Sequence, residues 1–291
     1  MRRRGLLWIF LGCLGWSQQA EWMDPVQAAP AGSRYVSFFS KTIDRESSYL
    51  IYLPPEYEVS AEQRFPVVYW LHGLGGNQRS GQVFLGMGVE AMRAGKAPPA
   101  IVVLVNGMNN SMYTNAKDGS LPMEQVIIKD LIPHVDGTYR TIADRKGRAI
   151  EGYSMGGFGA ARLGLKYAEL FGAVSVMAGA LHTEDTLAER RAAIFQQIYG
   201  GDKAYYKEHS PWTIAGQKAA AAKGTRVRIG VGGEDQLKDW NRQYHELLEN
   251  LGLKNEFFLV PGVGHNGGQF YRQMGEPVWA FYREVFGAAV P

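Results

Sequence analysis

The chain has 291 residues, of which 46% are hydrophobic, 12% aromatic and 20% charged, and it contains one Cys. This composition is typical of a folded protein with a large core and excludes a disordered chain. One Cys excludes a disulfide framework and any cysteine-based zinc or iron–sulfur cluster. Arg2, Arg3 and Arg4 account for the formal net charge of +3. The rest of the chain is neutral, so its charge indicates no nucleic-acid partner.

The N-terminus has the pattern of an export signal. Three arginines come first, residues 6–16 are largely apolar, and small and polar residues follow. The apolar stretch is too short to span a bilayer, which favours a signal peptide within residues 1–28 and leaves a buried helix as the alternative. Cleavage after Ala20 or Ala28 would release a periplasmic or extracellular protein. A Leu-Gly-Cys sequence ending at Cys13 is weakly similar to a lipoprotein site, so a lipid anchor to the membrane through Cys13 stays open.

Two kinds of strand pattern follow. Residues 34–40 and 48–53 alternate apolar and polar side chains on either side of a turn, which predicts an antiparallel pair at the edge of a sheet. Six later runs are short and almost continuously apolar, a pattern typical of strands that are covered on both faces, as in a parallel sheet. These runs lie at 67–71, 101–105, around 149–150, 173–177, 226–231 and 256–260.

Helical patterns alternate with these strands. The alternation predicts an α/β fold, with a mostly parallel central sheet, helices on both faces and the antiparallel pair at the N-terminal edge. No linker-like segment interrupts residues 34–287, so we expect one domain there. In such folds, functional residues collect at the carboxyl ends of the strands. The helices are expected at 82–94, 123–137, 157–167, 188–199, 240–251 and 269–286.

A Gly-x-Ser-x-Gly sequence, with Ser154 between Gly152 and Gly156, lies between a predicted strand and a predicted helix. A turn this tight strains the serine backbone, and side chains at the glycine positions would collide with neighbouring segments. The serine hydroxyl is then exposed beside a helix N-terminus, which favours negative charge. The pattern predicts that Ser154 is a catalytic nucleophile. No glycine-rich nucleotide-binding motif follows a strand.

A serine nucleophile needs a base, and the base needs an acid that orients it. In this type of site the acid follows the serine along the chain and the histidine comes last. His265 lies in a glycine-rich loop directly after the last apolar run, and we expect it to be the base. His182 and His209 lie in polar segments and are weaker candidates, either of which could line a pocket. Asp235 follows the preceding apolar run and is the expected acid, with Glu234 as the alternative.

Two further loops are expected around the nucleophile. The glycine-rich loop after the first core strand would bring the backbone N–H of Leu74 close to that of Met155, and the two would form an oxyanion hole. His72 in the same loop is expected to hold it in place. The loop after the next core strand should wall the pocket, where Asn109 and Tyr113 are candidate substrate contacts or, alternatively, ordinary loop residues.

Five segments of the chain are similar to motifs of the esterase-D-like branch of α/β-hydrolases. That branch includes S-formylglutathione hydrolases, feruloyl and acetyl-xylan esterases, enterochelin esterases and mycolyltransferases. The resemblance covers nearly all of the predicted domain. It implies the α/β-hydrolase fold, a Ser154–Asp235–His265 triad, and oxyanion amides from Leu74 and Met155. The similar segments lie at 71–76, 130–136, 152–160, 233–235 and 261–265.

The sequence therefore predicts an exported serine carboxylic-ester hydrolase that works through an acyl-enzyme, without a metal or an organic cofactor. Its partner is a small-molecule or polysaccharide acyl ester. The export signal favours the secreted branch members that act on feruloyl or acetyl esters of polysaccharides. Three alternatives stay open: an acyltransferase with the same acyl-enzyme, a thioesterase similar to S-formylglutathione hydrolase, and a non-catalytic binding protein on the same scaffold.

Overall fold

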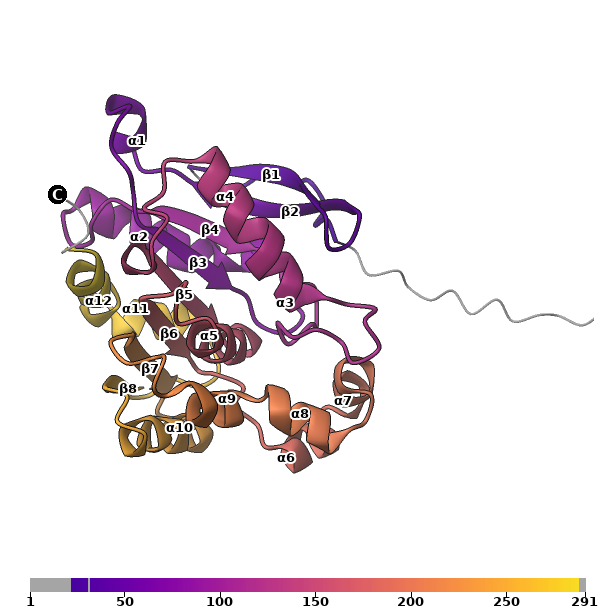
Figure 1. The fold of residues 1–291 in the computed structure, drawn as a ribbon. Helices are drawn as coiled ribbons and strands as arrows, with labels where there is room; N and C mark the ends of the chain where they lie inside the picture. Colours follow the sequence, from indigo (N-terminus) through magenta and orange to yellow (C-terminus); the bar gives the residue numbers. More distant parts are fainter. Residues whose placement is uncertain (1–21, 31, 288–291) are drawn as a thin grey trace, which may run out of the picture.

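A computed structural model describes residues 22–30 and 32–287 of the chain (Figure 1). Residues 1–21, which hold Cys13 and most of the predicted signal peptide, lie outside the described residues. Eight strands form one sheet in the order β1-β2-β4-β3-β5-β6-β7-β8. β2 runs antiparallel to both of its neighbours, and all the other neighbouring strands are parallel. The prediction of a mostly parallel sheet with an antiparallel N-terminal edge is confirmed.

The strands lie where the apolar runs predict them. Their bounds are β1 (Ser33–Ser40), β2 (Arg45–Tyr52), β3 (Val67–Leu71), β4 (Ile101–Val105), β5 (Arg148–Tyr153), β6 (Ala173–Met177), β7 (Arg226–Gly232) and β8 (Asn255–Val260).

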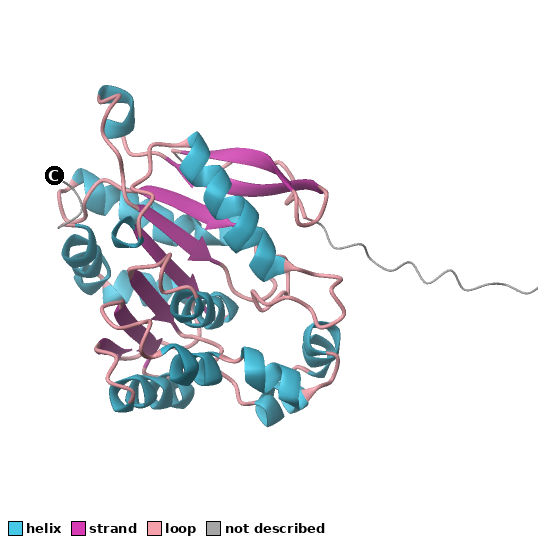
Figure 2. Ribbon diagram, viewed as in Figure 1, coloured by secondary structure: helices cyan, strands magenta, loops and turns pink. Residues whose placement is uncertain are grey.

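Helices cover both faces of this sheet, as Figure 2 shows. On one face lie α3 (Met123–Gln125), α4 (Ile132–Thr138), α5 (Met155–Lys166), α9 (Pro211–Lys218) and α10 (Lys238–Asn250), and on the other lie α2 (Gln82–Arg93), α11 (Gly267–Met274) and α12 (Glu276–Phe286). The side chains of β3 point alternately into the cores on the two faces of the sheet. Tyr69 and Leu71 belong to the core under the first set of helices, and Val68 and Trp70 belong to the core under the second. A strand buried on both faces needs apolar side chains at every position, which explains the continuous runs.

Two predicted helices are each divided in two. The helix expected at 188–199 is α6 (Glu184–Arg190) followed by α7 (Ala192–Tyr199), because the backbone of Arg191 leaves the helical region, with φ of −140° and ψ of 45°. The helix expected at 269–286 is interrupted at Gly275, whose φ of 59° separates α11 from α12. In the helix expected at 123–137, a stretch of π-helix, η2 (Val126–Leu131), joins α3 to α4.

Three α-helices within the described residues were not predicted. The first, α1 (Glu56–Val59), is a short helix after β2. α8 (Lys203–His209) begins after Asp202, and α9 begins after Ser210; each of these side chains accepts hydrogen bonds from the first turn of its helix. Such caps are sequence signals for a helix start. The helices α6 to α9 all lie in the β6–β7 segment (residues 178–225), which connects two neighbouring strands. Among the described residues, no helix is both long and apolar enough to cross a lipid bilayer.

Candidate active site

The chain turns sharply at Ser154, between the end of β5 and the start of α5. Ser154 has φ of 61° and ψ of −116°, a strained conformation that costs a residue with a side chain of order 1–3 kcal/mol. Hydrogen bonds hold the turn on both sides. The Ser154 N–H donates to the Met177 carbonyl, and the Ser154 carbonyl accepts from the Ala180 N–H, both at 2.9 Å. β6 and the residues after it therefore fix the serine in place.

Close packing explains the two glycines of this turn. A Cβ atom at Gly152 would lie 2.1 Å from the carbonyl oxygen of Gly156. A Cβ atom at Gly156 would lie 1.9 Å from the carbonyl oxygen of Leu71, at the end of β3. Neither position has room for a side chain, because α5 begins directly against β5 and β3.

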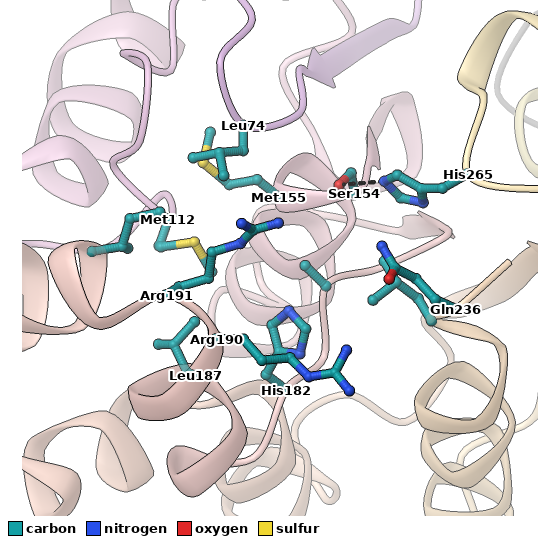
Figure 3. Close-up of a pocket in the computed structure, with 13 residues that line it drawn as sticks. Leu74, Met112, Ser154, Met155, His182, Leu187, Arg190, Arg191, Gln236 and His265 are labelled. Carbon is teal, nitrogen blue, oxygen red and sulfur yellow. Dashed lines mark hydrogen bonds between the residues drawn. The ribbon is translucent and has the colours of Figure 1, made fainter.

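The structure brings the side chains of Ser154, His265 and Asp235 together. His265 Nε2 lies 2.9 Å from Ser154 Oγ (Figure 3), and His265 Nδ1 lies 2.7 Å from Asp235 Oδ2. The other oxygen of Asp235, Oδ1, accepts a hydrogen bond from the Leu237 N–H at 2.9 Å. With a carboxylate as its partner, Nδ1 carries the proton, which leaves the Nε2 lone pair facing the serine hydroxyl.

Burial distinguishes Asp235 from Glu234, the two residues that the sequence offers as the acid partner of His265. Asp235 is 4% exposed, whereas Glu234 is exposed to solvent. The contact with the imidazole comes from Asp235. The ring of Tyr153 supports the imidazole from one side, with ring centroids 5.1 Å apart. His265 is thus held between a carboxylate, an aromatic ring and the serine.

Leu74 and Met155 line the same cavity as Ser154. Met155 is the first residue of α5, so its N–H has no acceptor within the helix. Among the hydrogen bonds of the described residues, neither the Leu74 nor the Met155 N–H has a protein acceptor. The loop is held by the Gly75 N–H, which donates to the Asn109 carbonyl at 2.9 Å. Asn109 itself is exposed and is not among the residues that line the cavity, so a substrate contact there stays a prediction.

His72 and Tyr113 lie buried beneath this loop. His72 Nε2 accepts a hydrogen bond from the Gly107 N–H at 3.0 Å, so Nδ1 is the nitrogen that donates to the Gly73 carbonyl, at 2.8 Å. The Tyr113 hydroxyl donates to the His72 carbonyl at 3.0 Å. Tyr113 is 0% exposed and its ring packs against Gly107 and Gly159. The prediction that Tyr113 contacts substrate is wrong, because a fully buried side chain supports the loop instead.

A cavity of 220 Å³ opens beside Ser154, and the β6–β7 segment supplies much of its wall. The position of that segment over the site depends on how it packs back onto the sheet. No local sequence motif predicts this packing. Within residues 22–30 and 32–287, no three His, Cys, Asp or Glu side chains are grouped so that they could hold a metal ion. The cavity is lined by Leu74, Met112, Ser154, Met155, Ala180, His182, Leu187, Arg190, Arg191, Ile194, Gln236, Leu237 and His265.

Acid should destabilise this protein through its buried histidines. Burial lowers the pKa of His72 to about 4, and burial together with the charges of Arg191 and Arg190 lowers the pKa of His182 to about 4. Both imidazoles stay neutral in the folded protein at a pH where unfolded histidines gain protons. The free energy of unfolding should therefore fall as the pH falls from about 6.5 towards 4, by about 3 kcal/mol for His72. Urea unfolding at several pH values measures this loss.

The matched control is His72→Gln, whose amide keeps one donor and one acceptor but does not titrate. The variant should lose less stability than the wild type over the same pH range. Parallel curves for the two proteins would contradict the role assigned to His72.

The sheet, the strained turn after β5 and the loops gathered at its carboxyl end define an α/β-hydrolase fold. A solved structure of a ferulic acid esterase shares this fold, with a TM-score of 0.74 and 22% identity over 87% of this chain and 99% of that chain. Residues 40–291 match the family model described as "Putative esterase". The chain therefore belongs to this esterase family, and the predicted resemblance is confirmed.

Two curated relatives are also similar to this chain. Esterase Rv1288 of Mycobacterium tuberculosis is 28% identical over 259 residues, which cover 79% of this chain and 55% of the relative. An endo-1,4-beta-xylanase/feruloyl esterase of Xylanibacter ruminicola is 28% identical over 224 residues, which cover 74% of this chain and 31% of the relative. The chain thus spans about half the length, or less, of the curated relatives it matches.

Proposed function

We propose that this protein is an exported serine carboxylic-ester hydrolase, with Ser154 as nucleophile, His265 as base and Asp235 as the acid that orients the base. One observation carries the proposal: hydrogen bonds of 2.7 and 2.9 Å link the carboxylate, the imidazole and the strained serine in sequence. Membership of the esterase family supports ester hydrolysis as the reaction.

In the proposed reaction, Ser154 Oγ attacks the ester carbonyl carbon while His265 Nε2 takes the hydroxyl proton. The amides of Leu74 and Met155 hold the negative oxygen of the tetrahedral intermediate. The bond to the alcohol oxygen then breaks, and the alcohol leaves with the proton from His265. Water, deprotonated by the same imidazole, attacks the acyl-enzyme and releases the acid and free Ser154. Asp235 stabilises the imidazolium in both halves of the cycle, which require no metal or organic cofactor.

The proposed substrates are acyl esters of polysaccharides with feruloyl or acetyl groups. The name of one curated relative includes feruloyl esterase, and one solved structure with the same fold is named a ferulic acid esterase. The His265 side chain is 30% exposed, so water can reach the acyl-enzyme.

Export is part of the proposal, and packing favours cleavage of the signal after Ala20. Trp22 is 6% exposed, and its carbonyl accepts a hydrogen bond from Asn106 Nδ2 at 3.0 Å. The Gln78 N–H donates to the Asp24 carboxylate at 2.9 Å. Cleavage after Ala28 would remove these contacts with the loops that follow β3 and β4, whereas cleavage after Ala20 keeps them. The intact mass of the exported protein decides between the two sites.

A fluorophosphonate probe and an ester panel test the proposed activity. The probe should modify the peptide that contains Ser154, and the protein should release acid from acetyl, feruloyl or longer acyl esters. Product analysis with and without a sugar acceptor separates hydrolysis from acyl transfer. A folded protein that neither reacts with the probe nor hydrolyses any ester would contradict the proposal and favour the non-catalytic alternative.

A further inference from the structure

Two consecutive arginines line the cavity beside Ser154. Arg190 is the last residue of α6, and Arg191 is the residue that separates α6 from α7. Neighbouring residues of an unbroken helix point about 100° apart, so the break at Arg191 helps to aim both side chains at one cavity. In Figure 3 the Arg191 side chain extends from the end of α6 towards Met155 and Ser154, while Arg190 extends past His182 on the side of Gln236.

The described residues offer these two guanidinium groups no carboxylate partner. Among the ion pairs of residues 22–30 and 32–287, none includes Arg190 or Arg191. No Asp or Glu is among the residues that line the cavity. The carboxylate of Asp235 is already hydrogen-bonded through both oxygens, to His265 and to the Leu237 N–H. The cavity wall opposite the nucleophile is therefore positively charged.

His182 lies beside the two arginines in the wall of the cavity. The side chain is 8% exposed, its Nδ1 has no hydrogen-bond partner within the described part of the chain, and its ring packs edge-on against Trp240 at 4.7 Å. After burial, the charges of Arg191 and Arg190 are the next causes of its lowered pKa. The guanidinium of Arg190 also lies over the Trp240 ring, 5.7 Å from the centroid, which restricts where that side chain can lie.

We propose that Arg190 and Arg191 bind a carboxylate of the substrate, so that the enzyme prefers esters that carry a negative charge. This inference rests on the proposed esterase function. Guanidinium groups match carboxylates in shape and donate two parallel hydrogen bonds to them. The carboxylate can belong to the acyl group, as in a half-ester of a dicarboxylic acid. It can equally belong to the alcohol, as in a uronic acid unit of an acidic polysaccharide. The arginines position the ester and take no part in bond making or breaking.

Two matched pairs of esters test the proposal and separate the two sources of charge. The monophenyl ester of adipic acid and the phenyl ester of adipamic acid differ only in a charge on the acyl side. The compounds 4-acetoxybenzoate and 4-acetoxybenzamide differ only in a charge on the alcohol side. We expect kcat/KM of the wild type to be about tenfold higher for the charged member of at least one pair, mainly through a lower KM. Salt at about 0.5 M should reduce this preference, because it screens exposed charges.

The variants are Arg190→Gln, Arg191→Gln and the double variant, with Arg45→Gln as the control. Arg45 is exposed at the start of β2, so its substitution removes one positive charge, as each single variant does, without touching the cavity. The double variant should lose most of the preference by raising KM for the charged ester. The kcat/KM of the double variant for the neutral esters should stay within about twofold of the wild type. For the Arg45→Gln control, kcat/KM for the charged and for the neutral esters should both stay within the same limit.

Different results overturn the two proposals. Hydrolysis of all four esters by the wild type without a charge preference would refute carboxylate binding and leave the esterase function standing. Equal losses for charged and neutral esters in the double variant would also refute it, and would show that the arginines only shape the cavity wall. Failure of the wild type to hydrolyse any of the four esters, together with no reaction with the fluorophosphonate probe, would refute the esterase function itself.

Discussion

The variant Ser154→Ala is expected to lose ester hydrolysis almost completely, by between about 10⁴- and 10⁶-fold in kcat. Removing Oγ removes the atom proposed to form the acyl-enzyme, while His265 and Asp235 keep their mutual hydrogen bond at 2.7 Å. The strain at φ of 61° does not depend on the hydroxyl, so the fold should survive. Initial rates with a short p-nitrophenyl ester measure the loss, and circular dichroism and thermal unfolding check the fold.

Ser37→Ala is the matched control for this variant. Ser37 is exposed on β1, and its substitution removes the same atom from a position far along the sheet from the site. The control should hydrolyse the ester at the wild-type rate. A Ser154→Ala protein that is folded and retains more than about a tenth of the activity would show that another residue is the nucleophile.

The variant Glu151→Ala is expected to lose about 3–5 kcal/mol of unfolding free energy. Glu151 lies in β5, three residues before Ser154, and its side chain is fully buried. Its carboxylate accepts hydrogen bonds from Arg228 Nη2 at 2.7 Å and from the hydroxyls of Tyr271 and Tyr282 at 2.7 and 2.6 Å. Truncation would leave the buried Arg228 charge without its carboxylate partner, which costs far more than the lost contacts of a surface pair.

Glu284→Ala supplies the comparison, because Glu284 forms a solvent-exposed ion pair with Arg226. An exposed pair contributes up to about 1 kcal/mol, so this variant should unfold close to the wild type. Urea unfolding of the three proteins measures the difference. Similar midpoints for Glu151→Ala and Glu284→Ala would mean that the buried network contributes no more than a surface pair.

The strands of the central sheet could be predicted closely, because a strand that is buried on both faces has a continuous run of apolar residues. β3, β4 and β6 each read as five apolar or small residues in a row, and the structure places them at the predicted bounds. The turn at Ser154 could also be predicted, because its two glycines are required by backbone atoms that approach within van der Waals distance. Both features are local, so a short stretch of sequence contains the whole physical reason.

The cavity wall could not be predicted, because its residues depend on long-range packing. Arg190 and Arg191 belong to a region that reads as one continuous helix, and the break at Arg191 has no proline or glycine to mark it. The prediction that Tyr113 contacts the substrate failed for the same kind of reason. Its place in a loop after a core strand suggested contact with a ligand, but Gly107 and Gly159 leave room for its ring to pack inward. Whether a loop side chain faces the site or the core is decided by residues that are distant in the sequence.

The origin of the cavity residues has a consequence for how such an enzyme can change. The side chains proposed for the chemistry come from the turn after β5 and the loops after β7 and β8, whereas α6 and α7 lie wholly within residues 178–225. A graft of another sequence in place of α6 and α7 alone would thus replace the charged wall and keep Ala180, whose N–H holds the Ser154 carbonyl. If both proposals hold, the residues that select the substrate and those that cleave the ester bond lie in separate segments, and one set can diverge without a change in the other.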